Sequence, residues 1–412
     1  MSDAVDVAIV GGGAAGLMAG IWAGRTDPHR RVAVLDGAAT LGAKILISGG
    51  GRCNVTHDVV DADAFAGASR NAIRKVLRRF DVPQTVAFFR DLGVELKRED
   101  TGKLFPVSDR ARDVLDALVG ASRAAGVVSM HPWRVETVVR GASGFVLAGP
   151  AGRLDARAVV LATGGRSVPK TGSDGHGYAI ARSLGHTVTP RILPALVPLT
   201  LPRGHVLTQL AGVTVPATLE VRSATGKRLV AFTDSTLCTH VGLSGPSVLD
   251  VSRYFLDARA DDPGAQLVIN WLPGETPASV DAWLQTLGKA TPGRRLQARL
   301  PERLARALCV EAGVDPSAPA GTLTRERRRA LAGTLTALVL PITGDRGFTH
   351  AEVTAGGVPL TQLRLETLES RVTPGLFVCG EVCDVDGRIG GYNFQWAWAS
   401  GYVAGVAVAR SG

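Results

Sequence analysis

The first apolar positions of the chain form a short continuous run. VDVAIV, at 5–10, is rich in β-branched residues and predicts a buried parallel strand. AAGLMAGIWAG follows with apolar residues at helical spacing, and the run at 31–36 predicts a second strand. A strand, a glycine turn, a helix and a second strand make a βαβ unit, so this region predicts a doubly wound parallel sheet.

The hydrophobic pattern then changes twice along the chain. Helical spacing continues near 72–92 and 111–125, and strand-like runs alternate up to ARAVVLATGG at 156–165. From 190 the chain is rich in proline and then alternates as antiparallel hairpins do, whereas 278–340 has Ala, Leu and Arg at helical spacing. After GFTHAEVTAGGV the chain returns to a short strand that ends in glycine, GLFVCGE.

This organisation predicts an α/β protein of three parts. A discontinuous nucleotide-binding domain comprises 1–189 and 346–412, a β-rich insert comprises 190–277, and a helical domain comprises 278–345. A chain of 412 residues exceeds what one hydrophobic core usually covers, which agrees with several domains.

The loop after the first strand, GGGAAG, matches the G-x-G-x-x-G pattern of dinucleotide-binding proteins. Gly11 permits the tight turn, Gly13 lets the backbone approach a pyrophosphate, and Gly16 lets the helix pack on the strand. The helix directs its free N–H groups at the phosphates. Asp36, at the end of the second strand, is placed to accept hydrogen bonds from ribose hydroxyls.

The late return to a strand favours FAD over NAD as the dinucleotide. A simple NAD dehydrogenase is expected to complete its cofactor domain early and to continue into a contiguous second domain. Here GLFVCGE comes near the end of the chain. A trailing segment that touches the cofactor far from the first loop suits a long ligand such as FAD.

The segment ISGGGRCN, at 47–54, combines three glycines with a fixed cation, a thiol and an amide. The glycines let the backbone lie against a planar ring. Arg52 can pair with pyrophosphate or with the charge on a reduced flavin, and Asn54 can bind ring or ribityl groups. The alternative is a structural loop in which Asn54 caps a turn. Cys53 has no His or second Cys nearby in sequence, so a buried thiol is preferred over a catalytic one.

The trailing segment GRIGGYNFQWAWASGYVAG holds five of the few aromatic residues of the chain. Gly390 and Gly391 precede a predicted helix whose N–H groups, from Tyr392 to Gln395, would face the negative side of a reduced flavin. Tyr392 is the candidate for the flavin edge. The aromatic residues Trp396, Trp398 and Tyr402 are assigned to packing.

Seven motifs together resemble the BaiN/RdsA-like family of NAD(P)/FAD-dependent oxidoreductases, also labelled aminoacetone-oxidase-like flavoproteins. They are VAIVGGGAAGLMAG, LGAKILISGGGRCNVT, KLFPVSDRARDVLDAL, VLATGGRSVPKTGSDGHGYAIARSLGH, PALVPL, THVGLSGPSVLDVSR and GLFVCGEVCDVDGRIGGYNFQWAWASG. The resemblance spans nearly the whole chain in order. SGGGRCN and GGYNFQWAW are the most specific of these motifs.

The resemblance implies an FAD-binding Rossmann-like domain, a β-barrel-like insert and a small helical domain. It implies reduction of a conjugated carbon–carbon double bond, on oxo-bile acids in one branch and on a uridine of ribosomal RNA in another. Two departures from the usual pattern are Asp36, where Glu is common, and Cys383, where an aliphatic residue is common. The cofactor contacts expected from the motifs are Gly11, Gly13, Ala14, Ala15, Gly16, Asp36, Lys44, Ser48, Gly49, Gly50, Gly51, Arg52, Cys53, Asn54, Thr163, Gly164, Gly380, Glu381, Asp384, Gly390, Gly391, Tyr392, Asn393 and Phe394.

Tyr392 and His240 are the candidate catalytic residues. His240, in CTHVGLSGP, would serve as a proton donor, although a lone histidine is more often structural. No second glycine fingerprint is available for a nicotinamide cofactor, so NAD(P)H is expected to bind transiently at the flavin, or another reductant to serve. No metal site is predicted.

The charge of the chain leaves two kinds of partner open. The net charge is +9, and much of the basic charge lies between Arg294 and Arg329. This region is interpreted as a solvated helical face, with contact to ribosomal RNA as the alternative to a small-molecule substrate. A non-catalytic flavin-binding protein is a further alternative. The scattered cysteines, the acidic amino terminus and the lack of a long apolar run predict a cytoplasmic protein without a membrane span.

Overall fold

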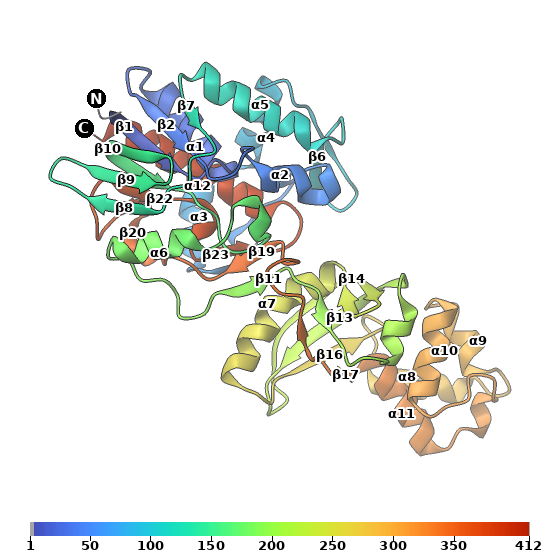
Figure 1. Cartoon of the computed structure of the whole chain (residues 1–412). Helices are drawn as coiled ribbons and strands as arrows, with labels where there is room; N and C mark the ends of the chain where they lie inside the picture. The colour runs from blue at the N-terminus through green and yellow to red at the C-terminus, as the bar shows by residue number, and fades with distance from the viewer. Residues whose placement is uncertain (1–3, 412) are drawn as a thin grey trace. The chain divides into compact units, whose positions relative to one another are not determined.

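The first apolar run forms the central strand of a parallel sheet in the computed structural model, which describes residues 4–411 (Figure 1). β1 (Ala4–Val10) pairs with β2 (Val32–Leu35) on one side and with β10 (Gly152–Leu161) on the other. β7 (Val128–Met130) extends the sheet beyond β2, and β22 (Leu376–Val378) extends it beyond β10. All five strands are parallel, so the predicted parallel sheet is confirmed.

Antiparallel strands complete this sheet. β9 (Phe145–Gly149) pairs with β10 and with β8 (Thr137–Arg140), and β21 (Glu369–Ser370) joins β22 to β20 (Leu363–Arg364). The other strands of this part of the chain are β3 (Thr56–His57), β4 (Phe65–Gly67), β5 (Leu96–Arg98), β6 (Lys103–Pro106), β19 (Val353–Ala355) and β23 (Val385–Gly387).

Six helices surround the sheet, and a seventh, the longest, ends the described chain. They are α1 (Ala14–Thr26), α2 (Ala43–Ile47), α3 (Arg70–Leu77), α4 (Val82–Asp91), α5 (Ala111–Ala124), α6 (His176–Ser183) and α12 (Tyr392–Arg410). The helical stretch expected near 72–92 is two helices rather than one, because Asp81 caps α4 through a capping box with Gln84 and Pro83 follows. No helix among residues 4–411 combines the length and apolarity needed to cross a bilayer.

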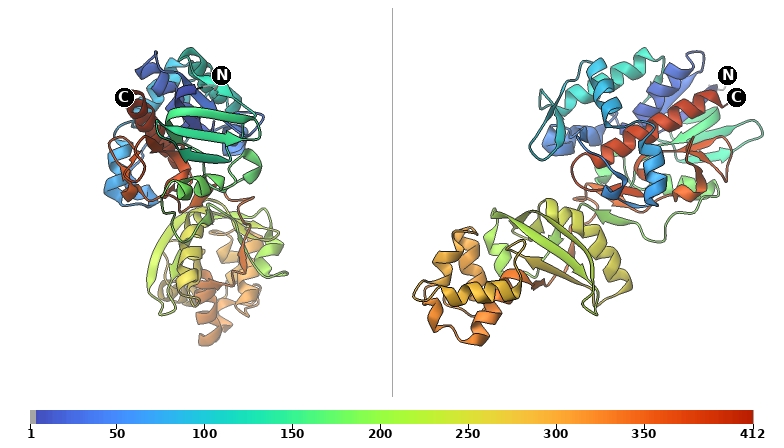
Figure 2. Two further views of the ribbon diagram at one scale, coloured as in Figure 1. Left: turned by 60° about the vertical axis from the view of Figure 1, so that its left-hand side comes forward. Right: turned by 180° about the vertical axis from the view of Figure 1, so that it is seen from behind.

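α12 packs directly on α1 because glycines remove side chains from the contact (Figure 2). A Cβ placed on Gly401 would lie 2.5 Å from the carbonyl oxygen of Ala15, and one on Gly405 would lie 2.4 Å from that of Ala19. The backbones therefore approach more closely than any larger residue permits. This contact fixes the start of α12 relative to the glycine loop that precedes α1.

The chain divides into two compact units, 1–194 with 352–412 and 195–351. The chain passes from the first into the second within β11 (Leu193–Ala195). In the second unit the strands follow the order β17-β16-β13-β14-β15-β12-β18. They are β12 (Leu199–Thr200), β13 (Thr214–Arg222), β14 (Arg228–Thr239), β15 (Gly242–Ser244), β16 (Gln266–Asn270), β17 (Leu338–Leu340) and β18 (Gly344–Asp345), and the helices are α7 (Pro246–Asp261), α8 (Pro277–Thr286), α9 (Pro292–Leu296), α10 (Glu302–Glu311) and α11 (Arg325–Thr336).

The strands and helices of the second unit share one hydrophobic core. Leu219 of β13, Phe255 of α7, Leu308 of α10 and Leu331 of α11 belong to the same buried cluster. The finer division of this unit into a barrel-like insert at 190–277 and a helical domain at 278–345 stays a prediction.

Replacing Gly405 by valine should destabilise the first unit, because the new side chain would overlap the backbone of Ala19. We expect the free energy of unfolding to fall by about 1–3 kcal/mol, the usual cost of overpacking a core. Urea unfolding followed by circular dichroism measures this change.

Gly120→Ala in α5 is the matched control, because among residues 4–411 no atom outside the backbone of α5 and the two chain neighbours lies within 4 Å of a Cβ built there. Helix propensity alone should make that variant neutral or up to about 1 kcal/mol more stable. Equal destabilisation by the two substitutions would contradict the packing argument.

Candidate functional site

The carboxyl ends of three parallel strands meet at one edge of the sheet. The N–H of Ala162, after β10, donates to Val10 O at 2.9 Å, and the N–H of Cys379, after β22, donates to Leu161 O at 3.1 Å. A Cβ on Gly380 would lie 2.7 Å from the Cβ of Ala15. The leading glycine loop and the trailing segment therefore adjoin, which is the arrangement expected if both touch one extended ligand.

The leading loop has the geometry of a phosphate-binding turn. Gly11 has a φ of +105°, and a Cβ on Gly16 would lie 1.8 Å from Gly11 O, so both positions require glycine. Gly13 is the N-cap of α1, and no described atom lies within 4 Å of a Cβ built on it. The backbone there is open to a ligand, and the first N–H groups of α1, at Ala14 and Ala15, have no side-chain cap within residues 4–411. This arrangement fits a pyrophosphate.

The Asp36 carboxylate is fixed beside this loop. Its Oδ2 accepts the Gly12 N–H at 2.7 Å, and its Oδ1 accepts the Ala38 N–H at 2.7 Å. A carboxylate oxygen can accept two hydrogen bonds, so each oxygen keeps capacity for a ribose hydroxyl. The shorter Asp side chain thus holds the loop and keeps acceptor capacity, and its contact with a ribose stays a prediction.

A polar network joins α2, the loop after β10, β19 and the segment after β22. Lys44 Nζ lies 2.7 Å from Glu381 Oε2 and also donates to the hydroxyl of Ser167. Glu381 Oε1 accepts the Ser167 hydroxyl at 2.9 Å and the Thr354 N–H at 3.0 Å. The carboxylate of Glu381 accepts from three protein donors, and its expected contact with ribityl hydroxyls stays a prediction. Its first task is to tie α2 to the trailing segment.

Ser167 and Thr354 are site residues that the motifs did not identify. Ser167 is fully buried, and the Thr354 hydroxyl accepts the N–H groups of Arg166 and Ser167 at 2.7 and 3.1 Å. Ser167 lies in the quoted motif GGRSVP, which is a weak signal, whereas nothing in AEVTAGG distinguishes Thr354 from a strand residue.

Two predicted contact residues have buried polar atoms without a partner in the described part of the chain. These atoms are Asn54 Oδ1 and Thr163 Oγ1, and the Ser173 hydroxyl beside Gly164 shares this property. An unpaired buried oxygen costs about 1–3 kcal/mol unless a ligand or water satisfies it. The atoms of Thr163 and Ser173, which follow β10, therefore fit a polar ligand at this edge, and Asn54 Oδ1 offers an acceptor in the segment at 48–54.

In the segment at 48–54, the glycines present an exposed backbone, whereas the side chains of Ser48 and Arg52 have partners within the protein. Gly49, Gly50 and Gly51 all have positive φ, and apart from its chain neighbours no atom of the described residues lies within 4 Å of a Cβ on Gly50, so an exposed backbone surface is present. Ser48 instead turns inward, and its hydroxyl donates to Ile45 O at 2.7 Å. Arg52 pairs with acidic residues rather than pointing to open space.

Arg52 is surrounded by partners within the protein. Its Nη1 lies 2.7 Å from Glu99 and 3.5 Å from Asp109, and its guanidinium stacks 4.0 Å above the Phe105 ring. The hydrogen bond to Glu99 raises the pKa of Arg52. The charge of Arg52 is balanced by these two carboxylates.

Cys53 is a structural thiol. It is fully buried, and burial raises its pKa to about 12. A thiol is nucleophilic as its thiolate, which is scarce at neutral pH with such a pKa. Cys379 and Cys383 are likewise buried and free, in agreement with packing roles.

In the trailing segment, two glycines have positive φ, and Asn393 and Asp384 form hydrogen bonds within the protein. Gly390 and Gly391 have φ of +128° and +98°, and a Cβ on Gly391 would overlap Thr56. The Asn393 amide is used within the loop, donating to Gly387 O and accepting Gly387 N–H at 2.8 Å each. Asp384 holds the chain through its backbone, accepting the Ala68 N–H at 2.9 Å.

The aromatic residues of α12 divide as their spacing predicts. Trp396 donates to Gly380 O at 3.0 Å and Trp398 donates to Val55 O at 2.8 Å, so both are buried anchors. Phe394 stacks on Trp398 with ring centroids 5.4 Å apart. Phe394 therefore packs through its ring, and only its backbone N–H remains a candidate contact.

Tyr392 begins α12 and is held by aromatic neighbours. Its ring stacks on His57 at 5.0 Å, and Phe65 meets it edge-on at 6.0 Å. His57 Nε2 lies 3.0 Å from Thr101 O, which fixes the imidazole. The other candidate, His240, is exposed in the turn between β14 and β15 of the second unit.

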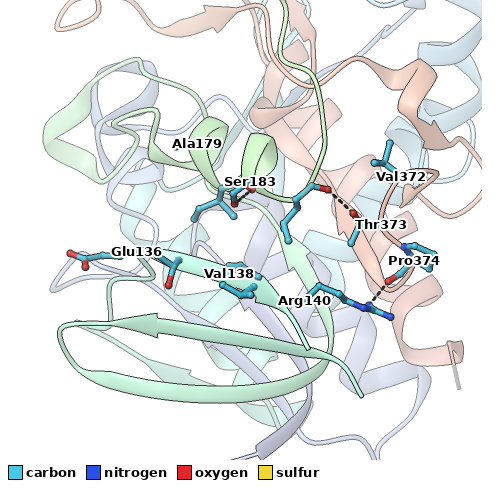
Figure 3. Close-up of a pocket in the computed structure, with 12 residues that line it drawn as sticks. Glu136, Val138, Arg140, Ala179, Ser183, Val372, Thr373 and Pro374 are labelled. Carbon is cyan, nitrogen blue, oxygen red and sulfur yellow. Dashed lines mark hydrogen bonds between the residues drawn. The ribbon is translucent and has the colours of Figure 1, made fainter. Parts of the chain in front are cut away.

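A separate cavity of about 660 Å³ lies beside β8 and α6 (Figure 3). Val138 of β8, Ile180 and Leu184 line it, and Arg140 bonds to Pro374 O across one end. None of the predicted cofactor contacts lines this cavity. It is distinct from the edge of the sheet that carries the glycine loops.

The fold and the glycine loop define a Rossmann-type dinucleotide-binding protein. Residues 5–407 match the family described as the HI0933-like protein Rossmann domain, and the chain belongs to this family. The resemblance to the BaiN/RdsA-like family and the α/β Rossmann-type fold class are thereby confirmed.

Two curated relatives cover the chain almost from end to end. The 3-dehydro-bile acid delta(4,6)-reductase of Clostridium scindens is 36% identical over 98% of this chain and 99% of the relative. The ribosomal RNA dihydrouridine synthase of Escherichia coli is 35% identical over 96% of each chain. Among solved structures, the 3-ketosteroid delta1-dehydrogenase of Sterolibacterium denitrificans has a TM-score of 0.54, at 14% identity over all of both chains. This structural likeness supports the fold.

The buried thiols predict a loss of stability at alkaline pH. Burial raises the pKa of Cys379 to about 12 from an ordinary value near 9. Because the pKa of Cys379 is higher in the folded than in the unfolded protein, the protonated thiol contributes fully to the free energy of unfolding below pH 9. This contribution is lost as the pH rises toward 12. Each such thiol should lower the free energy of unfolding by about 1.4 kcal/mol per pH unit in that window.

Urea unfolding of wild type and Cys379→Ala between pH 8 and 11 tests this expectation. Above pH 9 the free energy of unfolding of the variant should fall less steeply with pH than that of wild type, by about 1.4 kcal/mol per pH unit, which corresponds to one proton. Parallel slopes for the two proteins would show that Cys379 ionises freely in the native state.

Proposed function

We propose that this protein is an FAD-dependent oxidoreductase that reduces a carbon–carbon double bond conjugated to a carbonyl group. The observation that carries the proposal is the junction of Gly11, Thr163 and Gly380 at one edge of the sheet, with unpaired polar atoms along it. When bound, FAD supplies hydride transfer to the substrate.

The residues of the chain have separate tasks in this proposal. The N–H groups that follow Gly13 bind the pyrophosphate, and Asp36 accepts the ribose hydroxyls. Thr163 and Asn54 donate or accept along the length of the cofactor. Lys44, held by Glu381, supplies a fixed positive charge at the same edge. The N–H groups at the start of α12 stabilise negative charge near the reacting ring.

Tyr392 is proposed to orient or protonate the substrate. Its ring is stacked on His57 and is met edge-on by Phe65, which helps to define its position. A proton must reach the carbon next to the carbonyl, and a tyrosine hydroxyl or a water bound to it can deliver that proton. NAD(P)H is proposed as the electron donor.

The names of the two curated relatives suggest two classes of substrate. One is named for reducing delta(4,6) bonds of a 3-dehydro-bile acid, and the other for making dihydrouridine in ribosomal RNA. Both names imply saturation of a double bond conjugated to a carbonyl group. We propose a small enone as the substrate class. Ribosomal RNA is the second candidate, which the basic segment at 294–329 favours.

Purified protein should be yellow and carry one FAD per chain. Stopped-flow mixing with NADPH and with NADH under anaerobic conditions should bleach the flavin absorbance with one of the two donors. A correctly folded, colourless protein that does not bind added FAD would overturn the proposal.

Removing the charge of Lys44 should weaken FAD binding. The proposed contact of Lys44 with FAD is a hydrogen bond between charged groups, so Lys44→Met should remove a contribution of about 1.5–3 kcal/mol, roughly 10- to 150-fold in the dissociation constant. Lys75→Met, at an exposed lysine of α3, is the control. Fluorescence titration of apoprotein with FAD gives both constants. Equal affinities for the two variants would remove Lys44 from the site.

A further inference from the structure

The helices α8 to α11 carry most of the excess positive charge of the chain. Residues 278–340 contain ten basic and five acidic side chains, within a protein of net charge +9. The apolar positions of these helices are directed into the core, as at Leu296, Leu304 and Leu335, which are fully buried. The arginines therefore occupy the outer surface.

Two of these arginines are neutralised within the protein. Arg299 lies 2.8 Å from Glu275, and Arg328 lies 2.7 Å from Asp281. Asp281 belongs to 278–340, whereas Glu275 lies just before this segment. The remaining arginines face solvent with little acidic compensation.

Three helices bring cations to the single loop at 312–317. The N–H of Gly293, at the start of α9, donates to Pro316 O at 3.1 Å, which places the adjacent Arg294 beside the loop. Arg327 of α11 bonds to Gly313 O. Arg306 of α10 is close enough to contribute to a lowered pKa of Asp315, after the hydrogen bonds from Ser317.

We define the basic surface as Arg294, Arg295, Arg306, Arg325, Arg327 and Arg329. All six are exposed, and within residues 4–411 none of them forms a salt bridge to a carboxylate. A concentration of like charges repels itself and destabilises the compact state slightly. A polyanion that binds there relieves this repulsion and gains affinity by counterion release.

We propose that the basic surface binds the phosphate backbone of RNA. The inference rests on the ribosomal RNA branch of the proposed function and assigns a surface to it. Two relatives named as ribosomal RNA dihydrouridine synthases match 96% and 100% of this chain. An anionic membrane would call for several exposed apolar side chains among the cations, and of the large exposed hydrophobics only Val310 belongs to α8–α11.

The test uses the full-length FAD-loaded protein and a fluorescent 40-nucleotide structured RNA transcribed from ribosomal sequence. Binding is measured by anisotropy between 50 and 300 mM KCl. The triple variant Arg294→Ser, Arg306→Ser, Arg327→Ser removes one cation from each of α9, α10 and α11. The control Arg70→Ser, Arg90→Ser, Arg112→Ser removes three exposed cations from the first unit.

Each phosphate contact contributes about 0.7–0.9 to the slope of log K against log salt. The slope for the triple variant should therefore be shallower than that of wild type by about two to three units. Its dissociation constant for RNA at 100 mM KCl should rise at least tenfold, whereas that of the control should stay within twofold of wild type. Equal losses in both variants, or no RNA binding by wild type, would overturn the proposal. Binding to vesicles with 25% phosphatidylglycerol that matches the RNA affinity and depends on the same arginines would assign the surface to lipid instead.

The FAD content and the rate of flavin reduction separate this inference from the proposed function. Both should be unchanged in the triple variant. Loss of RNA binding with intact flavin reduction supports the basic surface. A protein that binds RNA through these arginines but holds no FAD would contradict the proposed function and leave the basic surface standing.

Discussion

The close approach of α12 to α1 is the constraint on which the site depends. Gly401 and Gly405 let the last helix lie against the backbone of the first, and no side chain separates them. Because α12 and α1 are then fixed to each other, the start of α1 lies against the middle of α12, and Gly380 adjoins Ala15 at the edge of the sheet. A ligand that reaches from one to the other finds both ends already in place.

The ion pair between Lys44 and Glu381 acts at the same edge in a different way. Packing is non-directional, whereas this pair and its hydrogen bonds to Ser167 and Thr354 fix the orientation of particular side chains. The network links segments that are more than 300 residues apart in sequence. It also explains why a carboxylate is suited to position 381, since it both accepts a hydrogen bond from the Lys44 ammonium and balances its charge.

Local sequence pattern predicted the parallel sheet, the glycine loop and the packing role of Trp396 and Trp398 well. Each of these depends on neighbours in sequence: a buried apolar run, a turn that only glycine permits, and helical spacing. The partners of Arg52, Glu99 and Asp109, could not be predicted, because they come from later segments that reach Arg52 through the tertiary fold. Thr354 was missed for the same reason. The break at Asp81 was readable in principle from its capping box, and the expected single helix overlooked it.

The insertion of 195–351 between two parts of one sheet has a consequence for synthesis on the ribosome. β22 and α12 are made last, although they pair with strands and helices made first. The leading strands must therefore wait, with the surfaces meant for β22 and α12 uncovered, while the whole second unit emerges. Chaperone demand should be greatest in this interval, and a nascent chain arrested before β22 would lack the segment at Gly380 that adjoins the start of α1.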